Sequence, residues 1–304
     1  MGFDSKYKYQ FLLNNGMVKV VSFINMKGGV GKTTLAVNIA YCLSWIFEKS
    51  VLLVDIDPQF NATQYLVSAP HYVKYIEDEE KCTIMDIFRE KPLRLPKTAS
   101  KGDKIARPEP TLENSTINIV YSLDGSFRPR LDLIPSNLEL MVLEISERGT
   151  EYRLARFLEK VKGRYDYVLI DCPPTTSIYT KAAFLASDAL LIPVKTDHLS
   201  SIGLPLLDSV IEKYEHDYAH KVEKLGIVFN MVNKAYNLDK KIMRDIKNSG
   251  RPVFENNVRR STTIARAVEN RQAIFRFRDS KISHGPDIIN ITKEFLVKLG
   301  DNIE

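Results

Sequence analysis

A glycine-rich octet near the start of the chain carries two lysines and two threonines, in the order Lys27-Gly28-Gly29-Val30-Gly31-Lys32-Thr33-Thr34. In a phosphate-binding loop, glycines allow backbone N–H groups to surround phosphate oxygens, a lysine contacts the β and γ phosphates, and the next hydroxyl binds Mg²⁺. The octet has these parts in this order, so Thr33 is the predicted Mg²⁺ ligand. The predicted nucleotide-binding residues are Gly28, Gly29, Val30, Gly31, Lys32, Thr33 and Thr34.

The segments on either side of the octet have the character that such a loop requires. An apolar run over residues 18–24 predicts a strand, and the run over 33–47 predicts a helix. The free N–H groups at a helix N-terminus favour anions, so a strand, a glycine loop and a helix in succession form a phosphate site. The local context therefore supports the nucleotide prediction.

Two later apolar runs end in acids. Residues 51–54 precede Asp55 and Asp57, and residues 167–170 precede Asp171. Continuous apolar runs are typical of parallel strands buried on both faces, and ligands bind beyond the carboxyl ends of such strands. Hydrolysis of a nucleotide needs a firmly held Mg²⁺ and a water aimed at the γ phosphate. The three acids are candidates for these tasks.

The octet departs from the ordinary loop because its first glycine is replaced and Lys27 stands five positions before Lys32. In this respect it resembles the deviant loop of the ParA/MinD superfamily of P-loop ATPases. The segment 55–59 resembles the D-x-D-P-Q segment of that superfamily, and the segment 171–174 resembles its D-x-P-P switch. Phe60 departs from the pattern, because relatives usually have a small residue there. Segments 131–138 and 191–197 are similar to ParA proteins and favour the DNA-partition branch.

The resemblance implies roles for individual residues. Lys27 would cross a sandwich dimer and contact the ATP of the partner subunit, and Asp57 would position or activate the attacking water. Asp55 and Asp171 would support the Mg²⁺ shell, through water. Asn230 would contact the adenine, although a turn-capping asparagine is nearly as well supported. The predicted catalytic residues are Lys27, Lys32 and Asp57.

The resemblance also implies an activity and partners. The chain would hydrolyse ATP with Mg²⁺, form a homodimer with ATP, and bind double-stranded DNA without sequence preference. A ParB-type centromere-binding partner would stimulate hydrolysis and so release the DNA. The expected location is cytoplasmic and nucleoid-associated, with no membrane partner.

Strand-like and helix-like segments alternate along the 304 residues, of which 44% are hydrophobic. This pattern predicts an α/β fold, namely a single-domain P-loop NTPase with a twisted, mostly parallel sheet flanked by helices on both faces. The domain is expected over 18–300, after an N-terminal extension over 1–17. Residues 91–116 are expected to form an exposed excursion.

Positive charge is concentrated in one part of the chain. Residues 221–281 hold 15 Lys and Arg against 6 Asp and Glu, a balance of +9, while the whole chain carries +5. Clustered cations contact phosphates without reading sequence, so this segment is the predicted DNA-binding face. The candidates are Lys240, Lys241, Arg244, Lys247, Arg259, Arg260, Arg266, Arg271, Arg276 and Arg278.

Two other functions remain open at this point. A MinD-like ATPase would bind a membrane surface through a C-terminal amphipathic helix, and residues 286–299 have apolar residues at helical spacing. Acids interrupt the polar face of that segment, which favours packing on the domain over binding to anionic lipid. A nucleotide-dependent scaffold with little turnover is the other alternative, and the intact Lys32, Thr33, Asp57 and Asp171 argue against it.

Overall fold

The sheet forms the centre of the fold in the computed structural model, which describes residues 18–89, 108–120, 130–145, 149–161, 163–233, 235–281 and 284–302. Within these residues seven strands form one sheet, in the order β3-β4-β2-β5-β1-β6-β7. The strands are β1 (Lys19–Phe23), β2 (Ser50–Asp55), β3 (Ile117–Val120), β4 (Arg130–Ile134), β5 (Tyr167–Asp171), β6 (Ala189–Lys195) and β7 (Glu223–Asn230). The edge strand β3 pairs antiparallel with β4, and the other pairings are parallel. The predicted mostly parallel sheet is confirmed.

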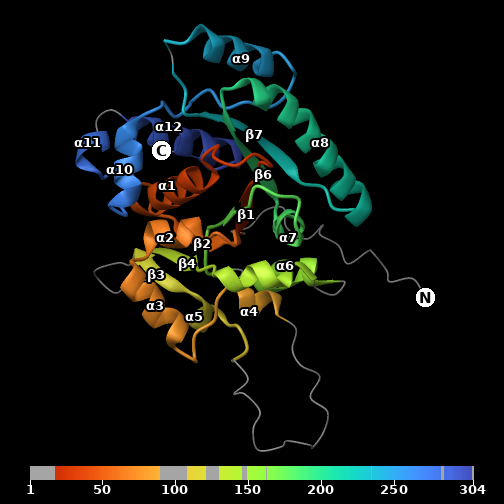
Figure 1. The fold of residues 1–304 in the computed structure, drawn as a ribbon, viewed down its shortest axis with the longest axis vertical. Helices are drawn as coiled ribbons and strands as arrows, with labels where there is room; N and C mark the ends of the chain where they lie inside the picture. Colours follow the sequence, from red (N-terminus) through yellow and green to blue (C-terminus); the bar gives the residue numbers. More distant parts are fainter. Residues whose placement is uncertain are drawn as a thin grey trace, which may run out of the picture.

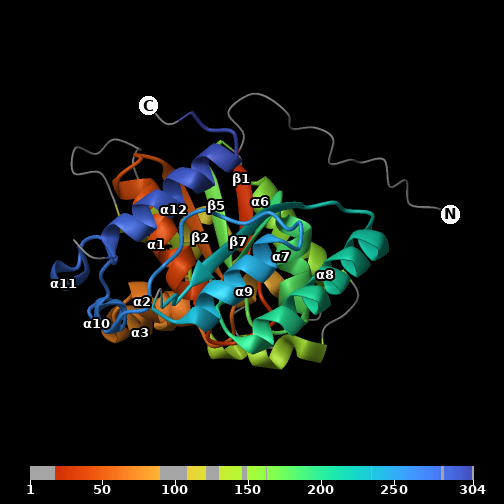
Figure 2. The same cartoon turned by 90° about the horizontal axis from the view of Figure 1, so that it is seen from above.

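Helices cover both faces of this sheet (Figures 1 and 2). The α-helices of the first half are α1 (Lys32–Trp45), α2 (Asn61–Leu66), α3 (Ala69–Glu77), α4 (Ile84–Phe88) and α5 (Leu112–Ser115). Two 3-10 helices follow, η1 (Leu138–Ile145) and η2 (Thr150–Tyr152). The later α-helices are α6 (Arg153–Glu159), α7 (Ile178–Ala186), α8 (His198–Tyr218), α9 (Asn237–Lys247), α10 (Thr262–Glu269), α11 (Arg278–Lys281) and α12 (Gly285–Lys298).

Alternate residues of the central strands enter separate cores, because successive side chains of a strand point to opposite faces. Val21, Leu53 and Leu169 lie in the core beneath α1 and α12. Their neighbours Val20 and Leu52 lie in the core beneath α4, α6 and α7. Burial on both faces explains why these strands have continuous apolar sequences.

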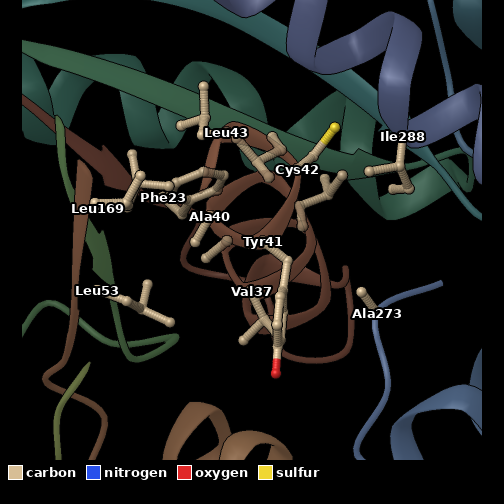
Figure 3. Close-up of a cluster of buried hydrophobic side chains, with 14 of the residues drawn as sticks. Phe23, Val37, Ala40, Tyr41, Cys42, Leu43, Leu53, Leu169, Ala273 and Ile288 are labelled. Atoms are coloured by element: carbon tan, nitrogen blue, oxygen red, sulfur yellow. The ribbon is translucent and has the colours of Figure 1, made fainter. Parts of the chain in front are cut away.

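The C-terminal helix α12 packs on the domain through its apolar side. Ile288, Ile291 and Phe295 are fully buried in the same core as α1. Figure 3 shows Ile288 close to Cys42 of α1, with Phe23 and Leu169 of the sheet on the other side of that helix. The apolar stripe predicted over 286–299 is therefore a core surface. None of the helices in the described ranges is long and apolar enough to cross a membrane.

The helix α8 follows β6, and it begins at His198 and ends at Tyr218. Its first turn is stabilised by Asp197, whose side chain accepts a hydrogen bond from the Ser200 N–H in the manner of an N-cap. The extension over 1–17 and residues 91–107 of the predicted excursion lie outside the described residues.

Candidate nucleotide-binding site

The predicted site residues converge at the carboxyl ends of the central strands. The glycine loop follows β1, Asp57 follows β2, and Asp171 ends β5. A cavity of about 560 Å³ opens there. Its lining includes the predicted Gly28, Gly29, Gly31, Lys32, Thr33, Thr34 and Asp57, together with Gln59, Asn61, Gln64, Tyr65, Pro174, Met231, Val268, Glu269 and Arg271, which the sequence analysis did not assign to the nucleotide.

Backbone conformation explains two glycines of the loop. Gly29 and Gly31 have φ of 70° and 86°, in the region that side chains other than glycine rarely adopt. A Cβ on Gly31 would also lie 2.0 Å from Nδ2 of Asn230. That amide donates to the Val30 carbonyl at 3.0 Å, and Asn230 is 3% exposed. Asn230 therefore stabilises the loop through the Val30 carbonyl. Its contact with adenine remains a prediction.

Lys32 is folded onto the loop itself. Its Nζ donates to the carbonyls of Asn25, at 3.0 Å, and Lys27, at 3.2 Å. Burial lowers the pKa of Lys32, and the nearby carboxylates of Asp171 and Asp57 oppose this shift. The lysine thus lies between the loop carbonyls and the acids, where it is positioned to meet a phosphate.

Asp55 and Asp57 make different contacts. Oδ2 of Asp55 accepts hydrogen bonds from both the N–H and the hydroxyl of Thr63, each at 2.8 Å, and its Oδ1 accepts from the Asp57 N–H. Asp55 therefore fixes the segment that carries Asp57. Oδ1 of Asp57 accepts from the Gln59 N–H at 2.9 Å, and Asp57 lines the cavity. The side chain nearer to an incoming nucleotide is therefore that of Asp57.

Phe60 adopts an unusual conformation just after these acids. Its φ of 43° and ψ of 38° place it in the left-handed region, which explains why a glycine suits this position. Its ring stacks on Tyr72, with the centroids 5.6 Å apart. The stacking offsets part of the backbone cost.

Asp171 has the environment expected of a cation site. It is fully buried, and neither carboxylate oxygen has a hydrogen bond of normal geometry among the described atoms, although the nearby Thr33 hydroxyl acts to lower its pKa. Burial raises its pKa well above the ordinary value of 3.8, and the nearby Asp55 adds to the rise. Burial likewise raises the pKa of Asp55 to about 7. Buried polar atoms are normally satisfied, so two orphan oxygens beside Thr33 and Lys32 fit a Mg²⁺ and its waters.

The Asp171→Asn variant is expected to be more stable than the parent protein at alkaline pH when no nucleotide is bound. In the unfolded chain Asp171 ionises near its ordinary pKa, whereas the folded protein retains the proton to higher pH. The folded state then binds more protons, so its stability falls as pH rises through that window. Asparagine cannot ionise, and the expected gain is about 1 to 3 kcal/mol.

Urea unfolding at several pH values measures this difference. The gain should vanish in acid, where Asp171 is protonated in both states. The matched control is Asp217→Asn, because that side chain is 46% exposed. Equal unfolding curves for parent and Asp171→Asn at every pH would show that burial does not perturb this carboxylate.

Lys27 lies outside the lining of the nucleotide cavity. Its Nζ contacts both carboxylate oxygens of Asp197, at 2.6 and 2.5 Å, and Lys27 is not among the described residues that line the cavity. Asp197 could not be predicted as a partner of Lys27, because it lies 170 residues away in sequence and the local motif gives no signal for it.

The candidate DNA-binding cations fall into two groups. Some have other contacts: Lys247 pairs with Glu255, Arg259 with Asp287 and Arg266 with Asp279, whereas Arg276 lies over the Trp45 ring and Arg271 lines the nucleotide cavity. Others are exposed and have no ion-pair partner within the described ranges, namely Lys240, Lys241, Arg244, Arg260 and Arg278. Three of these lie on α9, at the end of the molecule near α8 (Figure 1).

Comparison with known proteins gives a consistent family. A family model described as an AAA domain matches residues 18–224. The sporulation initiation inhibitor protein Soj of Bacillus subtilis is 33% identical over 234 residues, covering 76% of this chain and 79% of Soj. The chromosome partitioning protein ParA of Caulobacter vibrioides is 28% identical over 256 residues, covering 82% and 84% of the two chains.

A solved structure has the same fold. The plasmid partition protein from Borrelia burgdorferi bound to AMPPNP is 23% identical, covers 92% of this chain and 99% of its own, and has a TM-score of 0.70. The α/β architecture of this chain agrees with that structure. The chain belongs to the ParA family of P-loop ATPases, within the ParA/MinD superfamily.

Proposed function

We propose that this protein is a Mg²⁺-dependent ATPase of DNA partition, which dimerises with ATP and binds DNA in that state. The observation that carries the proposal is that the two loop lysines lie in different places. Lys32 lines the nucleotide cavity, whereas Lys27 lies outside it on Asp197. A lysine outside its own cavity is suited to completing the site of a second subunit.

The residues of one subunit have separate tasks in the proposed reaction. The loop N–H groups and Lys32 bind the phosphates, and Thr33 and Asp171 would hold Mg²⁺. When bound, Mg²⁺ neutralises charge on the phosphate oxygens. Asp57 orients the attacking water and accepts its proton, while the partner's Lys27 stabilises charge on the transferring phosphoryl group.

A dimer face beside Lys27 supports the same proposal. Asp197 caps α8, and this helix exposes Ile202 by 65% and Leu206 by 57% within its first three turns. The two side chains are four residues apart and share one face of the helix, and contiguous exposed apolar surface often marks a contact site. A second copy that received Lys27 would cover them.

The α9 surface supports DNA binding by charge. Lys240, Lys241 and Arg244 are exposed on this helix, and Lys240 and Arg244 line a groove of about 440 Å³. Phosphate contacts of this kind give affinity without sequence preference and make it dependent on salt. Two subunits would present two such surfaces to one duplex, so dimerisation would raise affinity.

The Lys240→Gln, Lys241→Gln, Arg244→Gln triple variant is expected to bind DNA with a weaker salt dependence. Each lost phosphate contact should reduce the slope of log K against log salt by about one, so the slope should fall by about three per subunit. Fluorescence anisotropy with duplexes of two unrelated sequences, at several salt concentrations, measures the slope.

Arg259→Gln is the matched control for these cations. It removes one positive charge of the same basic segment, but Arg259 is held by Asp287, with Nε and Nη2 bonds of 2.9 and 3.0 Å. This variant should lose stability and keep the DNA slope of the parent protein. An unchanged slope in the triple variant would exclude α9 from the DNA surface.

The membrane alternative has less support, because the apolar side of α12 is already buried against α1. Flotation with anionic vesicles and ATP distinguishes the two functions. A partition ATPase should stay at the bottom of the gradient, whereas a membrane-binding ATPase should rise with the vesicles. A scaffold without turnover would retain ATP through many binding cycles. We propose a cytoplasmic, nucleoid-associated location and stimulation by a ParB-type centromere-binding partner.

A further inference from the structure

We propose that Asp197 is a latch that holds Lys27 within its own subunit until a second subunit binds. The proposal rests on the proposed function in one respect, the role of Lys27 across the dimer. Asp197, which follows β6, would be a positioning residue for Lys27. The free energy needed to break its ion pair with Lys27 would oppose dimerisation.

The latch is built from contacts on both sides of the carboxylate. Nζ of Lys27 approaches Oδ1 and Oδ2 of Asp197 within 2.6 Å. Oδ1 also accepts hydrogen bonds from the N–H and the hydroxyl of Ser200, both at 3.1 Å. Because Ser200 lies in the first turn of α8 and is buried, the carboxylate has a fixed position.

The backbone of Lys27 is held separately from its side chain. The Lys27 N–H donates to Oδ1 of Asn25 at 2.9 Å, and Nδ2 of Asn25 donates to the Pro193 carbonyl at 2.7 Å. The loop therefore stays attached to β6 when Nζ leaves Asp197. Only the flexible side chain has to move.

Partial exposure makes the pair reversible. The side chains of Lys27 and Asp197 are 29% and 30% exposed, so water replaces the ion pair at a modest cost. Burial acts to raise the pKa of Asp197, but its hydrogen bonds from Lys27 and Ser200 outweigh that effect and leave the pKa below its ordinary value. The carboxylate is thus ionised at neutral pH and attracts the lysine.

Both latches must open when a two-fold dimer forms. Each subunit of a two-fold dimer must release its own Lys27, so the dimerisation constant contains the cost of two latches. If removing one latch frees the lysine about 3- to 10-fold, the dimerisation constant should rise by the square, roughly 10- to 100-fold. ATP in the partner site supplies the phosphates that compete with Asp197.

Asp197→Asn tests the latch with little change of shape. Asparagine is also a good N-cap, so the amide oxygen continues to accept from Ser200. The matched control is Asp217→Asn, which removes one charge at the other end of α8. Lys213 is the internal reference, because it is exposed on α8.

The first measurement uses nucleotide-free protein and a limiting amount of an acetylating ester, with peptide mass spectrometry. Lys27 should be acetylated about 3- to 10-fold faster in Asp197→Asn than in the parent or Asp217→Asn, while Lys213 reacts equally in all three. Equal rates at Lys27 would overturn the latch, whatever the protein does with ATP.

The second measurement is sedimentation equilibrium with AMPPNP and Mg²⁺. Dimerisation should be roughly 10- to 100-fold tighter in Asp197→Asn. Weaker dimerisation would overturn the proposal, because Asp197 would then act within the dimer. If the dimerisation constant is unchanged while Lys27 is acetylated faster, the part of the proposal that links Asp197 to dimerisation is wrong. If no protein dimerises, the proposed function fails, and the acetylation result still decides whether Asp197 holds Lys27.

Discussion

Replacing Lys27 by alanine is expected to lower DNA- and partner-stimulated ATP hydrolysis by about 10²- to 10³-fold, the usual effect of removing one group that stabilises transition-state charge. Much of the nucleotide affinity should remain, because Lys32 is the lysine that lines the cavity. Steady-state hydrolysis and binding of a fluorescent ATP analogue separate these two effects.

Lys213→Ala is the control for Lys27→Ala, since Lys213 is exposed on α8, remote from the loop in sequence. It should hydrolyse and bind ATP like the parent protein. Mixing Lys27→Ala with a subunit that has intact Lys27 but lacks a functional Lys32 should restore part of the rate, because each subunit supplies what the other lacks. Hydrolysis by Lys27→Ala at the parental rate would remove Lys27 from the reaction.

Replacing Asp57 by alanine is expected to reduce hydrolysis by about 10²- to 10⁴-fold, the range for a lost general base. ATP binding should survive, because the loop and Asp171 are untouched. The variant should accumulate as an ATP-bound dimer that remains on DNA, whereas the parent dissociates as ATP is consumed. Hydrolysis rates and the lifetime of the DNA complex after dilution measure both parts.

A second variant separates chemistry from local structure at this position. Oδ1 of Asp57 accepts a hydrogen bond from the Gln59 N–H, and Asp57→Asn retains an oxygen for that contact. Asp57→Asn should therefore fold as well as the parent and still turn over slowly. Normal turnover in Asp57→Asn would mean that the carboxylate neither activates nor positions the water.

Most of the fold could be predicted because the central strands are buried on both faces. Runs such as 51–54 and 167–170 are continuously apolar, and they become β2 and β5 at the centre of the sheet. The phosphate loop could be predicted equally well, because its glycines are required by the local backbone conformation. Gly29 and Gly31 both have positive φ.

Contacts between distant segments could not be predicted in the same way. Asp197, the partner of Lys27, caps the N-terminus of α8, and Asn230 reaches the loop across 200 residues of sequence. Arg259 was grouped with the DNA-binding cations by charge alone, but Asp287 holds it in place. A basic composition shows that cations are present, and only the fold shows which of them are already paired.

Arg271 illustrates the same limit at the nucleotide site. It was assigned to DNA from its neighbours in sequence, yet it lines the nucleotide cavity with a φ of 51°. This strained backbone follows α10, and no periodic pattern would have indicated it.

The most direct test of the account is the affinity for DNA in the presence of ATP, ADP or no nucleotide, measured across a range of salt concentrations. We propose that ATP drives dimerisation through Lys27 and that the dimer binds DNA with both α9 surfaces. DNA binding should therefore be at least about 10-fold tighter with ATP, with a steeper salt slope because two subunits contact the duplex. Equal affinity in the three nucleotide states, or no binding at low salt, would contradict the account.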